Sequence, residues 1–139
     1  MEKKMTLRDS ISNVLEEMFF LIEETPPDEI EESYDYVTRI DDKLFEAVLC
    51  MNRALANVIT ENFLGSPDEP DEEDILDCLQ EVVNMMAGNF VGAVYPDHDR
   101  LLPFPKAARF GGATPDASFE KDLIFYNGMP LAVFFKAHE

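Results

Sequence analysis

The stretch that decides the fold is DCLQEVVNMMAGN, residues 77–89. Apolar side chains recur through it and beyond it at helical spacing, so that they fall on one face of a helix. The residues predicted to face the core are Ile75, Leu79, Val82, Met86 and Phe90. We therefore predict a helix from about residue 74 to residue 95, ended by Pro96, which cannot continue the hydrogen-bond ladder.

The opposite face of this predicted helix carries a narrow stripe of four residues, Asp77, Glu81, Asn84 and Gly88, at steps of four, three and four. A carboxylate can pair with a lysine of a partner, and an amide can both donate and accept hydrogen bonds. Gly88 lacks a side chain and lets a partner's backbone come close. By spacing alone, the same stripe also fits an ordinary solvated helix face.

Upstream of this helix, the pattern predicts a hairpin and a second helix. Residues 34–40 alternate as a strand does, residues 41–43 form a turn, and residues 44–51 are apolar on both faces, which favours a central strand. Residues 54–63 have a helical period that ends at Gly65. A first helix is predicted over residues 6–22, with Met18 and Ile22 on its apolar face, and ends before Pro26 and Pro27.

Downstream, we predict a short strand at residues 101–104 and a hairpin of residues 119–126 and 131–136 around Asn127-Gly128, a pair that favours tight turns. Together these elements predict one domain, residues 1–139, of the α+β class. Its antiparallel sheet packs on long helices, and each half of the chain offers a helix followed by a strand pair.

The charge of the chain limits its partners. Eleven basic residues against 29 acidic ones give a net charge of -18, which repels nucleic acid and anionic membrane surfaces. We expect a cytoplasmic protein, because no secretory or membrane-spanning pattern is present and Cys50 and Cys78 do not form a disulfide framework. We expect no metal site or cofactor on this chain. A polar turn is the favoured interpretation of residues 97–99, and His138 has no evident partner.

The stretch at residues 77–89 resembles the signature helix of the CheC/CheX/FliY family of chemotaxis phosphatases. That signature is an acidic residue or serine, three spacers, Glu, two spacers and Asn, often continued as Met-x-Ala-Gly-Asn. Residues 53–57, 63–65, 101–103 and 134–135 are also similar to elements of this family, so that the resemblance covers nearly the whole chain.

The resemblance implies a protein phosphatase of two-component signalling that hydrolyses the aspartyl phosphate of a CheY-like response regulator. Asn84 would orient the attacking water, Glu81 would pair with the regulator's lysine, and Asp77 and Gly88 would support docking. The regulator would supply the Mg²⁺. The first helix offers Asp9, Asn13 and Glu16 in the wrong order for a second signature. With one site, the chain resembles one-site CheX more than two-site CheC. Phe19 and Phe20, where a second signature would need an amide, are interpreted as core or interface residues.

A different class of function stays open, a binding module of the same fold that docks on response regulators or flagellar switch proteins without hydrolysis. The sequence also predicts a homodimer. CheX-like members pair their sheets, and the apolar strand at residues 131–135 is expected at a sheet edge, where unpaired strands attract other strands.

Overall fold

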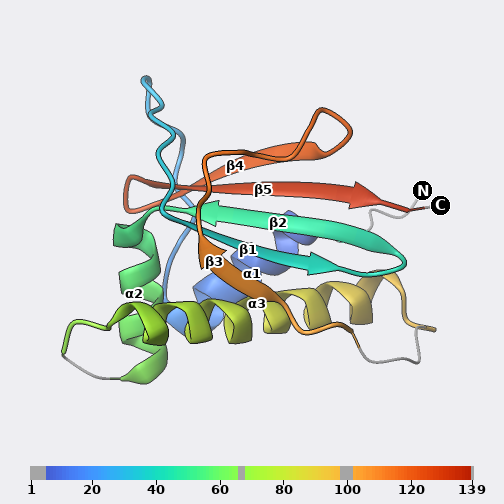
Figure 1. Cartoon of the computed structure of the whole chain (residues 1–139), viewed down its shortest axis with the longest axis horizontal. Coiled ribbons are helices and arrows are strands. Elements are labelled where there is room, and N and C mark those ends of the chain that lie inside the picture. Colours follow the sequence, from blue (N-terminus) through green and yellow to red (C-terminus); the bar gives the residue numbers. More distant parts are fainter. Residues whose placement is uncertain (1–5, 66–67, 98–101, 139) are drawn as a thin grey trace.

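The computed structural model describes residues 6–65, 68–97 and 102–138. Within these residues the chain forms three helices, α1 (Leu7–Phe19), α2 (Arg53–Leu64) and α3 (Glu72–Val94). The strands are β1 (Tyr36–Asp41), β2 (Phe45–Met51), β3 (Lys106–Arg109), β4 (Glu120–Tyr126) and β5 (Met129–Ala137). In Figure 1, α3 runs below the strands of the single sheet and α1 is seen behind β1. No helix in the described part of the chain is long and apolar enough to cross a membrane.

The sheet is antiparallel throughout, with the strand order β3-β1-β2-β5-β4. Two hairpins, β1–β2 and β4–β5, lie side by side because β2 pairs with β5. The second hairpin turns at Asn127 and Gly128, whose φ angles of 51° and 77° are the positive values that the sequence pair favours. The predicted α+β class and antiparallel sheet are confirmed.

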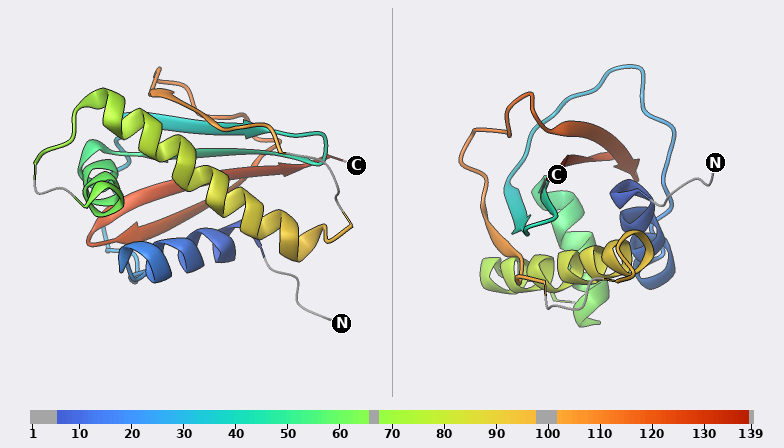
Figure 2. Two further views of the ribbon diagram at one scale, coloured as in Figure 1. Left: turned by 90° about the horizontal axis from the view of Figure 1, so that it is seen from below. Right: turned by 90° about the vertical axis from the view of Figure 1, so that its right-hand side faces the viewer.

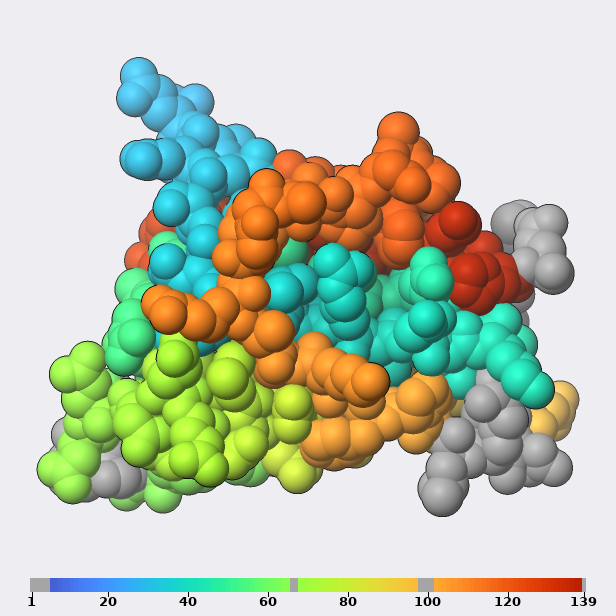
Figure 3. All heavy atoms as spheres, viewed as in Figure 1, coloured from blue at the N-terminus to red at the C-terminus, as the bar shows by residue number. Residues whose placement is uncertain are grey.

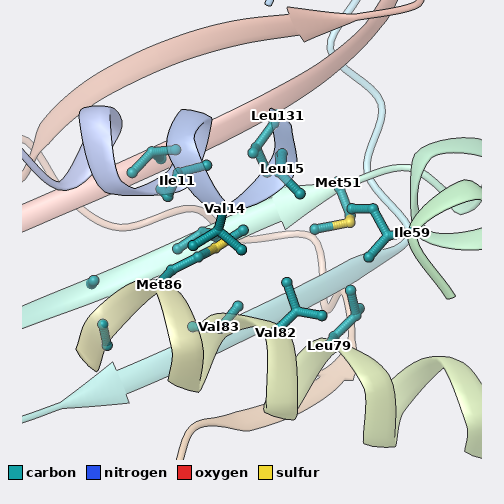
Figure 4. Close-up of a cluster of buried hydrophobic side chains, with 14 of the residues drawn as sticks. Ile11, Val14, Leu15, Met51, Ile59, Leu79, Val82, Val83, Met86 and Leu131 are labelled. Atoms are coloured by element: carbon teal, nitrogen blue, oxygen red, sulfur yellow. The ribbon is translucent and has the colours of Figure 1, made fainter. Parts of the chain in front are cut away.

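The helices cover one face of the sheet, and the main core lies between the two layers (Figure 2). Figure 4 shows side chains from α1, α2, α3 and the strands β2 and β5 meeting there. The five residues predicted to form the core face of α3 are all buried: Ile75, Leu79, Val82, Met86 and Phe90. Full burial of one such side chain contributes about 1.5–3 kcal/mol, so this face fixes how α3 is oriented.

The other face of the sheet carries a smaller apolar cluster of Val37, Val48, Cys50, Ala132 and Phe134. Aromatic side chains from the connecting segments cover it, and the rings of Tyr34 and Phe110 meet edge to face at 5.8 Å. Both faces of the central strands are therefore buried, as the apolar composition of residues 44–51 predicts.

The first helix ends earlier than predicted. It stops at Phe19, and Phe20 takes a left-handed conformation with φ 57°, well before the two prolines. The N–H of Phe20 donates to the carbonyl oxygen of Glu16, and that of Leu21 donates to Leu15. The placement of Met18 and Ile22 on the buried face was wrong, since they are 52% and 67% exposed.

Two strand predictions were also wrong. Of the strand predicted at residues 101–104, residues 102–104 are not a strand and residue 101 lies outside the described residues; the strand that follows α3 is β3. The strand at residues 131–135 is not at an edge, because β5 pairs with β2 on one side and with β4 on the other. The sheet edges are instead β3 and β4.

Candidate functional site

The candidate site lies on α3, whose start is fixed by capping. Asp71 is the N-cap: its side chain accepts from the N–H of Asp74, and the Asp74 carboxylate accepts from the N–H of Asp71. Glu72 and Glu73 add negative charge in the first turn, where the helix dipole is positive. The sequence therefore defines the residue at which α3 begins and places negative charge at the positive end of its dipole.

The side of α3 that faces β3 is held by a polar contact. The Oε1 atom of Gln80 accepts a hydrogen bond of 3.1 Å from the N–H of Ala107, and Arg109 pairs with Glu72 at 3.0 Å. Figure 3 shows the orange segment that includes β3 lying against the yellow-green helix. Sequence reasoning missed this role of Gln80, because a glutamine within a helix carries no signal for the strand that it binds.

The structure brings the four stripe residues together on the surface of α3. Asp77, Glu81 and Gly88 are exposed, and Asn84 is half-buried. Glu81 and Asn84 lie three residues apart, about 4.5 Å along the helix axis. Over the described ranges of the chain, the side chains of Asp77, Glu81 and Asn84 make no hydrogen bond or ion pair, so their polar groups are available to a partner.

Gly88 has no structural reason to be glycine within the described chain. A Cβ atom built there would meet nothing within 4 Å, and its backbone lies within the regular helix rather than at positive φ. Because glycine inside a helix destabilises it by about 1 kcal/mol relative to alanine, the residue calls for an explanation outside the chain.

The thiol beside the stripe is not a nucleophile. Cys78 is buried, and burial, with a smaller contribution from the Glu81 carboxylate, raises the pKa of its thiol to about 11. The nearby hydroxyl of Thr60 in α2, which donates to the carbonyl oxygen of Ala56, acts in the opposite direction. At neutral pH the thiol is protonated, whereas nucleophilic attack requires the thiolate. The groups that the stripe offers for chemistry are therefore the carboxylates of Asp77 and Glu81 and the amide of Asn84.

The corresponding part of α1 has a different structure. The carboxylate of Asp9 accepts from the N–H of Thr6 at 3.0 Å, and the Thr6 hydroxyl accepts from the N–H of Asp9. Asp9 thus caps its own helix, while Asn13 and Glu16 are exposed. The order of these residues in α1 gives no Glu-x-x-Asn pair.

Apolar side chains are exposed where α1 and α2 end. Phe20 is 84% exposed, and Phe19 is buried, with its ring 6.4 Å from that of Phe63 in α2. Both phenylalanines are interpreted from the sequence as core or interface residues. Phe19 is a core residue, and Phe20 is exposed. Phe63 and Leu64, at the end of α2, are also exposed, while Thr60, one turn earlier, is buried near Cys78 of α3. Exposed apolar side chains are therefore present at the end of α2, a helix that packs against α3.

The candidate site is a surface rather than a cavity. A cavity of about 480 Å³ lies elsewhere, between the start of α1 and the end of α3, where Leu7, Phe90 and Tyr95 are among the lining residues. An exposed stripe on a helix surface has the character of a site for a protein partner rather than for an enclosed small molecule.

Solved structures that resemble this chain include CheX and CheC-like chemotaxis proteins. CheX from Desulfovibrio desulfuricans has a TM-score of 0.72 at 17% identity, over 95% of this chain and 96% of that chain. A chain of the CheX–CheY–BeF3–Mg²⁺ complex from Borrelia burgdorferi has a TM-score of 0.69 at 16% identity, over 96% of both chains. CheX from Vibrio vulnificus has a TM-score of 0.67 at 18% identity, over 94% and 93%. The chain therefore has the fold of the CheX and CheC-like proteins.

A sequence model supports the same relationship for part of the chain. The model of the family described as Chemotaxis phosphatase CheX matches residues 45–108, which contain α2, the whole of α3 and most of β3. A comparison with curated proteins gave no match. The resemblance to the CheC/CheX/FliY family is thereby confirmed, with CheX as the member whose sequence model matches.

Proposed function

We propose that this chain hydrolyses the aspartyl phosphate of a CheY-like response regulator, with Asn84 orienting the attacking water and Glu81 pairing with the regulator's lysine. The observation that carries the proposal is the free Glu81–Asn84 pair on the surface of α3, inside the segment that the CheX family model matches. The presence of CheY with CheX in the Borrelia burgdorferi complex supports the choice of partner.

The absence of basic residues from α3 fits a shared mechanism. No lysine or arginine occurs between Glu72 and Val94, and the chain carries a net charge of -18. Developing charge on a transferring phosphoryl group needs cations for its stabilisation. On this proposal the regulator supplies them, as its Mg²⁺ and its lysine, and this chain needs no cofactor of its own.

Asn84 contributes the position of the water. Its amide can accept a hydrogen bond from the water and donate another to the phosphoryl group, which holds the water in line with the bond to be broken. Partial burial restricts the side chain, so that less conformational freedom is lost when the complex forms. An amide that orients water is a known device in phosphoryl transfer.

Glu81 and its neighbours would hold the two proteins in register. Its carboxylate is exposed and has no partner among the described residues, so that it can pair with a lysine on docking. Asp77 adds a second carboxylate one turn earlier, and Gly88 lets the partner's backbone approach the helix. Phe20, exposed at the end of α1, offers apolar area that a partner would bury.

Asn84→Ala tests the chemistry. We expect stimulated release of inorganic phosphate from a phosphorylated regulator to fall on the order of a hundredfold, as expected for loss of a well-placed orienting group. Regulator binding should change little, because the amide acts mainly on water. Asn13→Ala is the matched control, since it removes an exposed asparagine from α1 and leaves α3 intact. Full activity in Asn84→Ala would exclude the mechanism.

Glu81→Gln tests the docking role separately. Removing the charge while keeping the shape of the side chain should weaken binding of the regulator. The loss of phosphate release should therefore be largest at low regulator concentration. An unchanged affinity would remove Glu81 from this role. A binding module of the same fold remains the second candidate, and it would bind the regulator with no phosphate release from the unmodified chain.

A homodimer remains part of the proposal, with a different strand at its interface. Because β5 is paired on both sides, a continuous sheet across two copies would have to use an edge strand. β4 is the longer of the two edges, and within the described residues only Phe125 of this strand forms a bridge on its outer side, to Glu24. The remaining part of β4 offers unpaired backbone groups to a second copy.

A further inference from the structure

Three potential metal ligands meet at the end of the sheet where β1 finishes, away from the candidate site on α3. Asp41 is the last residue of β1, Glu46 lies near the start of β2, and His138 follows β5. One ligand atom from each lies within 4.8 Å of the other two, and Nε2 of His138 is 3.9 Å from Oε1 of Glu46. The sequence does not predict this cluster, because His138 lies far along the chain from the other two residues. No metal site and no partner for His138 are expected from it.

The strand register fixes these positions. Asp41 and Glu46 are direct cross-strand partners, so their side chains leave the sheet on the same face. Glu46 is also the partner of Lys136, and His138, two residues further on, extends from that face as well. The N–H of His138 donates to the carbonyl oxygen of Leu44 at 2.9 Å, which anchors the histidine beside the hairpin.

Within the described residues, neither Arg39 nor Lys136, which are cations on this face, forms an ion pair with Asp41 or Glu46. The Lys136 ammonium group stands over the ring of Phe119, 5.6 Å from its centroid. Across the described ranges, Glu46 forms one ion pair, with His138, and Asp41 forms none. The side chains of His138 and Glu46 are 33% and 30% exposed, which leaves them partly desolvated yet reachable by an ion.

We propose that Asp41, Glu46 and His138 bind a divalent transition-metal ion of the zinc type. Two carboxylates and one imidazole are ligands that Zn²⁺ accepts, with a water completing a tetrahedral site. Tetrahedral ligands about 2.1 Å from the metal lie about 3.4 Å apart, so that the cluster has to contract by roughly 1.4 Å at most. Rotation of partly exposed side chains provides such a movement. The net charge of -18 attracts cations to the site.

The ligand set also predicts selectivity. An imidazole favours Zn²⁺ over Mg²⁺ and Ca²⁺, which prefer oxygen ligands, and the usual affinity order places Zn²⁺ above Mn²⁺. The bound ion would tie the ends of β1, β2 and β5 together and raise the thermal stability of the chain. This site is independent of the proposed phosphatase activity, because neither its residues nor its strands carry Glu81 or Asn84.

The test is isothermal titration of the full chain with ZnCl₂ at physiological salt, followed by melting with and without the ion. We expect one saturable site and a higher Tm with Zn²⁺, and no such site for Mg²⁺. His138→Ala and Glu46→Gln should each reduce Zn²⁺ affinity on the order of tenfold or more. Circular dichroism establishes that both variants remain folded.

His98→Ala is the matched control, because it removes the other histidine of the chain, which lies outside the described residues. It should bind Zn²⁺ as the unmodified chain does. The proposal is overturned if the unmodified chain shows no saturable site, if His138→Ala and Glu46→Gln bind with unchanged affinity, or if His98→Ala abolishes binding. Loss of binding in the first two variants alone supports the assigned ligands.

Discussion

Gly88→Ala should make the protein more stable and a worse partner for the regulator. Gly88 lies inside α3, is exposed, and leaves open space where a Cβ atom would be. Alanine is favoured over glycine within a helix by about 0.8–1 kcal/mol, mainly because glycine loses more backbone freedom on folding. For a chain of 139 residues this corresponds to a rise in Tm of about 3–5 °C.

The effect on docking has the opposite sign. Gly88 lies one turn beyond Asn84 on the stripe, about 6 Å along the helix axis. If a partner's backbone packs directly on the glycine, an added methyl group overpacks the interface at a cost of about 1–3 kcal/mol. Since 1.4 kcal/mol is tenfold in affinity, regulator binding should weaken about 5- to 150-fold.

Gly92→Ala is the control for this prediction. Gly92 lies one further turn along α3 and is exposed, and a Cβ atom there meets nothing within 4 Å. Both variants should gain similar stability in thermal melts, and only Gly88→Ala should bind regulator more weakly in titration calorimetry. Unchanged affinity of Gly88→Ala for the regulator would refute the prediction that a partner's backbone packs directly on Gly88. A lower Tm would show that the glycine has a structural role in the folded chain.

Three further outcomes are expected. Asn13→Ala and Glu16→Ala should leave phosphate release close to that of the unmodified chain, and a large loss with an unchanged circular dichroism spectrum would place α1 in the site. Burial raises the pKa of both Cys50 and Cys78 to about 11 from 9.0. A thiol reagent at pH 8 should therefore label neither until the chain unfolds. Rapid labelling of the native chain at pH 8 would contradict this expectation. Because the pKa of each thiol is higher in the folded chain than in the unfolded chain, the contribution of these thiols to stability is complete below about pH 9 and falls as the pH rises towards 11. Light scattering at micromolar concentration should give twice 15.8 kDa, whereas a mass of 15.8 kDa would exclude the dimer.

The elements that were predicted correctly are those specified by local pattern. The apolar period of α3 has one solution, since Leu79, Val82 and Met86 share a face only in a helix. The turn at Asn127 and Gly128 requires positive φ, which few residue pairs tolerate. The end of α2 at Gly65, with φ 65°, follows from the same property of glycine.

The end of α1 was not predictable in this way. Phenylalanine is disfavoured in the left-handed conformation, so that nothing in the local pattern marks Phe20 as the point where the helix stops. Its position follows from tertiary packing. Leu21 is buried and Phe19 packs near Phe63, and the chain has to leave the helix between them for both to reach apolar surroundings.

The strands that were misplaced depend on pairing across the chain. β3 is short, and its residues are mostly exposed, so it has no alternating apolar pattern. It exists because residues 106–109 pair with β1 and Gln80 binds the N–H of Ala107. β5 was placed at an edge because it lies late in the sequence, although its apolar residues on both faces were the better guide to an interior position.

The charges of the chain explain how the proposed site would distinguish its substrate from free phosphate compounds. Helix α3 has no basic residue, and Arg109, close to its start, is paired with Glu72. A small phosphate ester would therefore meet carboxylates at Asp77 and Glu81 with no cation to offset the repulsion. A regulator brings its own Mg²⁺ and lysine, and the same carboxylates then attract it. On the proposed mechanism, the acidity that excludes small anionic substrates is what selects a protein substrate whose phosphoryl group is already neutralised.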